Sequence, residues 1–497
     1  MFSNVLYSWG GYLVVILAGF ILPRLIDRNV SQAGLGIWDF SWSFVSYMHL
    51  TMLGLGSSVN RYVARYRAVH DTDKLNQLIS TVMCIQIAVA FAVLIMSAIF
   101  AWLIPVFFKV RLGDQTQIAR WVVFLLGTSV SVSMLFDTSR GVITGCHRWD
   151  IHNLINSGSQ AFELLGMLTV FWLGGSLIGL SAVLLGVEIA TGLARLVISR
   201  RLCPELLVKF SFFRKKTAKE MYRFGIKSFV NGIPHLILLQ TTNMFIVSSL
   251  GPASLAVFAR STALIRHVET IISKFAFILA PAVSSLQSSQ DEEALKGFFL
   301  STTRYGVAFA VPLLSLMIFY GDLILRVWMG ARYSGTGVLA ILALGFFLPI
   351  SQNSVREVLT GLNKHGRVGI FGCVVSLTIF GIGIILVNNI GWTLERAALI
   401  ISVSVALGIG VAPGIFACKS LGISYRHYLR NSFLSPIVCN LAFIACLIGM
   451  RTALGDDNPI KVLLIGSSSS GIILILMYLR FVFPVGSWKK IFPNRMT

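Results

Sequence analysis

Fourteen long apolar runs, joined by short connections, dominate the sequence. A helix needs about 20 mostly apolar residues to cross the hydrocarbon core of a bilayer, and each run is of that order. Only 12% of the residues are charged, whereas water-soluble domains carry roughly 25%. We therefore predict an all-α polytopic membrane protein with 14 transmembrane helices. The predicted helices lie near 5–23, 38–60, 77–104, 118–138, 152–173, 177–199, 221–248, 253–281, 298–320, 337–360, 367–387, 393–417, 430–450 and 460–483.

Lysine and arginine are distributed unevenly between the connections. They number 24 after even-numbered runs, with the C-terminal tail included, and 10 after odd-numbered runs. Because positively charged connections stay in the cytoplasm, we predict that the even-numbered connections and both termini are cytoplasmic. The same excess accounts for the formal net charge of +21, so no nucleic-acid partner is expected.

The seven cysteines show no CxxC motif and no Cys/His spacing of a metal site. Most lie inside apolar runs, where cysteine behaves as a small hydrophobic residue. We expect no disulfide framework, no metal and no cofactor. The N-terminus has neither a basic segment nor a small-residue cleavage site, so we expect the first run to be a retained helix.

Two short segments of the first half recur in the second half. Residues 137–148 (DTSRGVITGCHR) are similar to residues 353–364 (NSVREVLTGLNK) at an offset of 216, and residues 32–41 are similar to residues 252–261 at an offset of 220. An offset of six helices preserves membrane orientation, which gives the parallel kind of repeat found in some transporters. The repeat predicts two pseudo-symmetric six-helix lobes around a central cavity, followed by a C-terminal helix pair.

The repeat and one basic segment divide the chain into four parts. We predict an N-terminal lobe of helices 1–6 in 1–199, a basic cytoplasmic linker in 200–219, a C-terminal lobe of helices 7–12 in 220–417, and the last two helices with the tail in 418–497. The basic residues of the linker are expected to fix its side of the membrane. Contact with anionic lipid or with a partner is the alternative.

The eighth predicted helix carries Arg260, His267 and Lys274 at intervals of seven residues. At about 1.5 Å per residue, these three form a cationic ladder roughly 21 Å long on one face. A charge at bilayer depth costs about 2.5–3.5 kcal/mol on insertion scales, so it needs a polar cavity or a partner. Snorkelling at the helix ends with a buried, satisfied histidine is the alternative. Because Phe275 to Pro281 still follow Lys274, we expect the ladder to line the cavity.

Other polar residues of the predicted helices are further candidates for lining the cavity. The cationic candidates beside the ladder are Arg24, Lys227, His235, Arg266 and Arg304. The candidates for a polar or coupling role are Asp39, His49, Asn231 and Glu269. An interfacial or packing role is the alternative for each. Since basic groups outnumber acids, the cavity is predicted to attract an anion, and arginine and lysine suit phosphate in particular.

Five carboxylates are candidates for coupling transport to protons or sodium: Asp137, Glu163, Glu188, Glu269 and Glu357. Each also has a basic residue or a helix end nearby. Asp137 is spaced three residues from Arg140, and Glu188 seven residues from Arg195. Structural ion pairing is therefore the preferred interpretation.

Several short motifs resemble those of a known superfamily. They are Leu22-Pro23-Arg24, Ala33-Gly34-Leu35-Gly36, Leu53-Gly54-Leu55-Gly56, Leu279-Ala280-Pro281-Ala282, Thr144-Gly145 and Thr360-Gly361. With fourteen helices in two lobes and a final pair, the chain resembles the polysaccharide transporter branch of the multidrug/oligosaccharidyl-lipid/polysaccharide exporter (MOP) superfamily. The resemblance implies a fold like that of the multidrug and toxic compound extrusion (MATE) transporters.

The resemblance also implies a function. A Wzx-type flippase of the bacterial inner membrane would move an undecaprenyl-pyrophosphate-linked oligosaccharide to the outer leaflet by alternating access. Its product would serve surface polysaccharides such as the O-antigen of lipopolysaccharide. The ladder would bind the pyrophosphate, and Trp38 and Trp42 would stack on sugars or anchor their helix at the interface. The implied partners are the lipid-linked substrate, membrane lipids, and a polysaccharide polymerase with its chain-length machinery.

Three other functions compete with this one. A lipid II flippase of the same superfamily would share a cationic cavity. A cation-coupled multidrug antiporter would need more acids than bases there. A membrane glycosyltransferase or polymerase would need a large outer loop with catalytic acids or arginines, and the odd-numbered connections are short. We therefore predict a transporter and not an enzyme.

Overall fold

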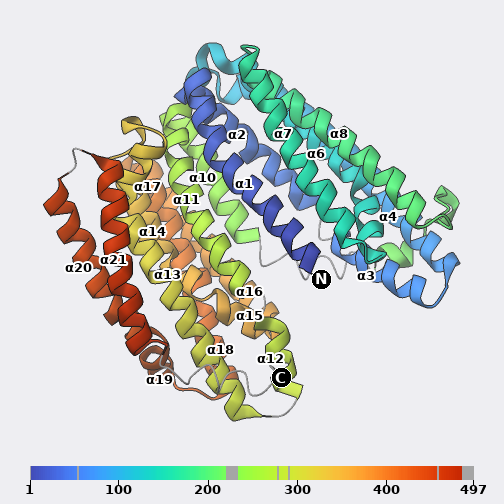
Figure 1. Ribbon diagram of the computed structural model, residues 1–497. Helices are drawn as coiled ribbons and strands as arrows, with labels where there is room; N and C mark the ends of the chain where they lie inside the picture. The colour runs from blue at the N-terminus through green and yellow to red at the C-terminus, as the bar shows by residue number, and fades with distance from the viewer. Residues whose placement is uncertain are drawn as a thin grey trace. The chain divides into compact units, whose positions relative to one another are not determined.

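The computed structural model describes residues 2–52, 55–219, 233–276, 279–288, 291–455 and 458–483. Within these ranges the chain is built of helices, turns and short connections, without a strand (Figure 1). The predicted all-α class is confirmed.

Nine helical segments of the described ranges are long and apolar enough to cross a membrane. They coincide with nine of the fourteen predicted runs, and the other five runs fall on shorter, interrupted or less apolar helices or partly outside the described residues. The exact number of fourteen therefore stays a prediction. The nine segments are Thr72–Phe107, Lys109–Gly145, Leu177–Leu202, Glu292–Trp328, Val338–Gly361, Gly366–Ile390, Leu394–Leu421, Tyr425–Leu454 and Pro459–Phe481.

Internal contacts divide the chain into two compact units, Met1–Ala256 and Val257–Thr497. This division falls later than the predicted linker at 200–219, because the helix that ends at Leu250 packs against a helix of the first unit. The four-part division drawn from the repeat stays a prediction. The helices of the first unit are α1 (Phe2–Asn29), α2 (Gln32–Met48), α3 (Leu55–Ala68), α4 (Thr72–Phe107), α5 (Lys109–Leu112), α6 (Thr116–Gly145), α7 (Trp149–Trp172), α8 (Leu177–Leu202) and α10 (Ile233–Leu250).

Helix α6 lies at the centre of the first unit, where it packs against α2, α3, α4 and α8 (Figure 1). Gly141 and Gly145, one turn apart on α6, bring α3 close. A Cβ atom added at Gly141 would lie 2.5 Å from Val59, and one at Gly145 would lie 2.7 Å from Val63. Small residues at this spacing allow two membrane helices to pack backbone to backbone.

The second unit begins within α11 (Pro252–Ala276). Its other helices are α12 (Leu279–Ser288), α13 (Glu292–Trp328), α14 (Val338–Ser351), α15 (Asn353–Gly361), α16 (His365–Ile390), α17 (Leu394–Val405), α18 (Ala412–Leu421), α19 (Tyr425–Leu429), α20 (Ser435–Leu454) and α21 (Pro459–Phe481). Two π-helical stretches, Ala406–Val411 and Arg430–Leu434, interrupt this series.

Helix α13 holds the second unit together, packing against α14, α20 and α21 (Figure 1). Two buried tyrosines connect it to the C-terminal pair. The Tyr320 hydroxyl donates to the Leu447 carbonyl at 3.0 Å, and the Tyr478 hydroxyl donates to the Ala308 carbonyl at 2.9 Å. Each bond satisfies a polar group inside an apolar interface, which membrane helices require.

The repeated segments adopt the same local structure in both units. His147 and Asn363, at equivalent positions, both have left-handed backbones, with φ of 60° and 55°. Their backbone N–H groups donate to the carbonyls of Thr144 and Thr360, each at 3.0 Å. The two copies therefore end their helices with one type of turn, which supports the internal repeat.

The predicted linker lies along the beginning of α4. The Asn76 side-chain carbonyl accepts from the Leu207 N–H at 2.9 Å, and the Thr81 hydroxyl accepts from the Arg214 N–H at 3.0 Å. Between them, the Ser80 hydroxyl donates to the Leu207 carbonyl at 3.4 Å and accepts from the Lys209 N–H at 3.2 Å. Backbone hydrogen bonds thus attach residues 207–214 to side chains at the beginning of α4.

Candidate functional site

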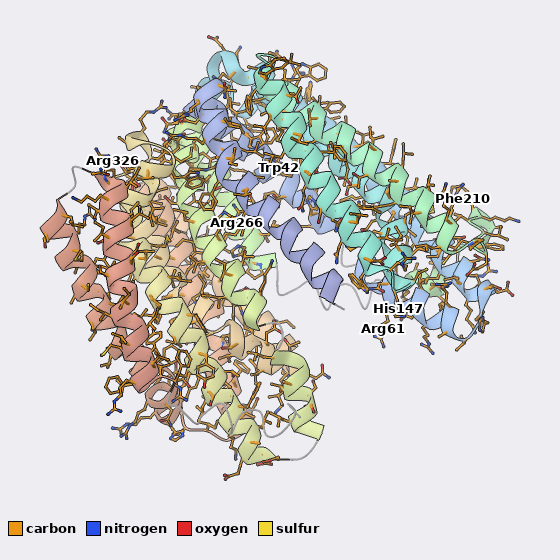
Figure 2. The ribbon with its side chains drawn as sticks, viewed as in Figure 1. Trp42, Arg61, His147, Phe210, Arg266 and Arg326 are labelled. Carbon is orange, nitrogen blue, oxygen red and sulfur yellow. The ribbon has the colours of Figure 1, made fainter. Side chains whose placement is uncertain are left out.

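The cationic ladder lies on one continuous helix, α11. Arg260 is buried, with 6% of its surface exposed, His267 is half-buried, and Lys274 is exposed. Arg266 projects from the same helix and is exposed (Figure 2). Because α11 is uninterrupted from Pro252 to Ala276, the three ladder residues keep the predicted spacing of two helical turns.

A different face of α11 is joined to α15 by a hydrogen bond. Asn353 Nδ2 donates to Ser273 Oγ at 2.8 Å. Burial disfavours the charge of Arg356 on α15, and the carboxylates of Glu269 and Glu357 offset part of that cost. At about 100° per residue, Glu269 lies roughly 140–180° from the three ladder positions, and Ser273 lies roughly 100–140° from them. Glu269 and the ladder therefore occupy different sides of α11.

The first unit holds four of the other candidates. Arg24 on α1, Asp39 on α2 and His235 on α10 are half-buried, whereas His49 is exposed just after α2. His49 Nδ1 lies 3.3 Å from the Val45 carbonyl of the preceding turn. Trp38 and Trp42 meet edge to face at 6.3 Å between ring centroids.

Three candidates remain outside these two groups. Lys227 and Asn231 lie outside the described residues. Arg304 is half-buried on α13 of the second unit, and its guanidinium lies 5.8 Å from the ring centroid of the neighbouring Tyr305. The ladder with Arg266 thus forms the densest group of predicted cationic site residues within one unit, and whether they bind substrate stays a prediction.

A network of charged and amide side chains connects α7 and α8 of the first unit. Arg195 Nη1 lies 3.6 Å from Glu188 Oε1, and Arg195 Nη2 donates to Asn156 Oδ1 at 2.9 Å. Asn156 Nδ2 in turn lies 3.1 Å from His152 Nε2. The predicted pairing of Glu188 with Arg195 is confirmed. Sequence reasoning missed Asn156, because nothing in its helical spacing marks it as the partner of an arginine 39 residues away.

Asp137 on α6 is buried and forms an ion pair with Arg140, as its spacing predicted. Gln86 on α4 lies within 3.5 Å of the same carboxylate and accepts a hydrogen bond from the Thr138 N–H at 3.1 Å. The acid is therefore compensated within the first unit. This geometry favours a structural role for Asp137.

Cys146 and Cys203 lie directly after α6 and α8, with 3.0 Å between their sulfur atoms. A hydrogen bond from Cys203, assisted by the nearby Arg67, lowers the pKa of the Cys146 thiol to about 7. The same interaction raises the pKa of Cys203. Their separation of 57 residues explains why the cysteine spacing did not indicate a pair. Across the described residues, no group of three or more His, Cys, Asp or Glu side chains could hold a metal ion.

The fold is similar to solved structures of transporters. The lipid II flippase MurJ in an inward-closed conformation matches with a TM-score of 0.71 at 14% identity, over 96% of this chain and 98% of that one. An inward-facing MATE-family multidrug resistance transporter of the MOP superfamily matches with a TM-score of 0.62 at 14% identity, over 86% and 96%. A MOP superfamily transporter from Pyrococcus furiosus, described as having a binding pocket of reverse polarity, matches with 0.60 at 12%, over 84% and 95%.

These likenesses confirm the predicted MATE-like fold. A search of curated proteins found no match. Residues 65–337, more than half of the chain, match the family described as polysaccharide biosynthesis protein. The chain therefore belongs to the polysaccharide biosynthesis protein family, with the fold of the MOP superfamily.

Proposed function

We propose that this protein is a flippase that translocates an undecaprenyl-pyrophosphate-linked oligosaccharide across the bacterial cytoplasmic membrane by alternating access. The observation that carries the proposal is the cationic ladder of α11, in a chain of the polysaccharide biosynthesis family. A pyrophosphate must cross a medium in which an uncompensated charge is expensive. Two bases and a histidine spread over about 21 Å could accompany it along that path.

The distribution of acids supports an anionic substrate. Glu269, the acid of α11, lies roughly 140–180° around the helix from the three ladder positions. The ladder charge is therefore not neutralised by that carboxylate. A cationic drug would be repelled by this face, so multidrug antiport is the weaker alternative.

Charge reversal in the ladder tests the proposal. We expect Lys274→Glu to insert at normal levels and to fail in complementing a bacterial strain that lacks its oligosaccharide flippase, whereas Lys274→Arg should retain function. Lys461→Glu is a matched control, because Lys461 is an exposed lysine near the start of α21. Full complementation by Lys274→Glu at normal expression would overturn the role of the ladder.

A second candidate function is lipid II transport, favoured by the similarity to MurJ over nearly the whole of both chains. Both substrates carry a polyprenyl pyrophosphate, so the ladder does not distinguish them. Rescue of a strain depleted of its lipid II flippase, together with failure to restore surface polysaccharide, would favour this candidate. The reverse outcome would favour the oligosaccharide.

The proposal includes a location and partners. The charge asymmetry of the connections supports cytoplasmic termini. A reporter enzyme that works only in the cytoplasm should therefore be active when it is fused after Thr497, and a reporter that works only outside the cytoplasm should be inactive there. A polysaccharide polymerase and its chain-length machinery would receive the translocated substrate. Crosslinking of the wild-type protein to the polymerase in intact cells would test that association.

A further inference from the structure

The segment 200–219 carries a strong positive charge, and within the described ranges no carboxylate forms an ion pair with its basic side chains. It holds seven basic residues and one acid, Glu205. Glu205 already lies 3.5 Å from Arg67 of α3. The side chains of Lys209, Arg214, Lys215, Lys216 and Lys219 are all exposed.

The same segment exposes apolar side chains between its basic ones. Phe210 is 77% exposed and Leu207 53% exposed, and Phe210 lies at one end of the first unit (Figure 2). Val208 and Phe213 are exposed as well. Aromatic and aliphatic side chains interspersed with lysine and arginine are typical of segments that lie in the headgroup region of a bilayer.

The backbone bonds to α4 keep these side chains on the outside. Leu207, Lys209 and Arg214 each donate their N–H group to a polar side chain at the beginning of α4, at 2.9, 3.2 and 3.0 Å. Turning the segment inward to bury Phe210 would break such bonds. The exposure of the apolar groups is therefore a property of the folded segment.

The position of the segment along α4 also indicates its depth in the membrane. Its exposed apolar side chains Ile87, Phe91, Ile95, Ile99, Trp102 and Val106 follow one another at intervals of three or four residues. From Ile87 to Val106 this stripe is about 29 Å long, which matches the hydrocarbon core of a bilayer. Thr81 and Asn76, which bind the segment, lie about 9 and 16 Å beyond Ile87 along the axis. The headgroup layer adds roughly 5–8 Å to each side of the core, so Thr81 lies at its outer edge, and the long side chains of the segment can extend back into this layer beside the N-terminal end of α4.

We propose that residues 207–216 form a binding surface for the anionic phospholipid headgroups of the leaflet beside the N-terminal end of α4. Lys209, Arg214, Lys215 and Lys216 pair with headgroup phosphates, while Phe210 and Phe213 enter the interface. The ring of Phe212, 5.8 Å from Lys209 Nζ, helps to orient that lysine. This surface serves to hold the first unit at a fixed depth, whatever substrate the protein moves.

The experiment measures phosphatidylglycerol bound to the full-length protein by native mass spectrometry, after release from nanodiscs with and without that lipid. Replacing Lys209, Arg214, Lys215 and Lys216 together by Gln should weaken phosphatidylglycerol binding at least about tenfold, since each base near an anionic surface contributes substantially. A matched control replaces the exposed Lys109, Arg111, Arg326 and Lys461 by Gln. The control should retain wild-type binding, and both variants should keep the wild-type melting temperature.

A photocrosslinking arm identifies what Phe210 touches. With p-benzoylphenylalanine at position 210, illumination of membranes should give adducts of phospholipid mass. Equal phosphatidylglycerol binding by the two quadruple variants would overturn the proposal. So would protein adducts at position 210 without lipid adducts, because the surface would then bind an acidic protein.

Discussion

The hydroxyl oxygens of Tyr47 and Thr241 lie 2.6 Å apart, joining α2 to α10 across 194 residues of sequence. One turn along α2, Asn243 Nδ2 donates to Ser43 Oγ at 3.0 Å. We predict that Tyr47→Phe and Thr241→Val each lower the free energy of unfolding by about 1 kcal/mol, and that the double variant loses little more than either single one. Thermal unfolding in detergent measures this. Ser248→Ala is the control, because Ser248 bonds to the Phe245 carbonyl of its own helix, and additive losses would contradict the pairing.

Gly36 of α2 faces the backbone of Pro252, and a Cβ atom at Gly36 would overlap the Pro252 carbonyl group. The obstruction is backbone, so it cannot be relieved by rotating a side chain. We predict that Gly36→Ala abolishes the folded, monodisperse protein on size-exclusion chromatography. Gly158→Ala, in a helix position with open space around it, should elute as the wild type. Normal elution of Gly36→Ala would show that α2 and Pro252 are farther apart.

The pair of Asp137 and Arg140 combines a buried acid with a half-exposed base. Removing the base leaves the carboxylate buried with weaker compensation, so Arg140→Ala should destabilise the protein by about 1–3 kcal/mol. Adding Asp137→Asn to that variant should recover most of the lost stability, because a neutral amide costs less to bury than an ionised carboxylate. Arg148→Ala removes an exposed ion pair with Asp150 and should cost less than about 1 kcal/mol. A melting series of these variants measures the differences.

Cys146 should be the most reactive thiol at neutral pH, because its pKa is lowered to about 7 by Cys203 and Arg67. The thiolate is the nucleophile, so we predict that its alkylation rate rises as the pH increases through 7. Cys203→Ala removes the hydrogen bond and should shift the midpoint upward. Mass spectrometry of iodoacetamide-treated protein between pH 5.5 and 9 measures both midpoints. A midpoint above pH 8 in the wild type would contradict the geometry.

His147 and Asn363 hold left-handed backbones that favour glycine. We predict that His147→Gly raises the free energy of unfolding by up to about 1 kcal/mol, and that Asn363→Gly raises it less, because asparagine tolerates this conformation better than most residues. Thermal unfolding of the two variants side by side provides the comparison. A larger gain at position 363 would contradict the steric explanation.

Helix positions were largely predictable from the sequence, and local pairs such as Asp137 with Arg140 followed from helical spacing. Long-range partners were not. Nothing in hydropathy or periodicity indicates that Asn76 binds the backbone of Leu207, 131 residues later. The same applies to Glu269, whose carboxylate offsets part of the cost of burying Arg356 of α15. The π-helical stretch Ala406–Val411 also lacks a spacing signal, since it changes the register inside an uninterrupted apolar run.

The matching turns at His147 and Asn363 bear on the evolutionary origin of the chain. A chain that ends corresponding helices in one way, 216 residues apart, carries the trace of a duplicated and fused ancestral gene. At the offset of 220, the ladder residues Arg260, His267 and Lys274 correspond to Phe40, Tyr47 and Gly54 of the first copy. None of these three is basic. The cationic ladder therefore belongs to one descendant copy alone, and the two copies have diverged in chemistry while keeping a common architecture.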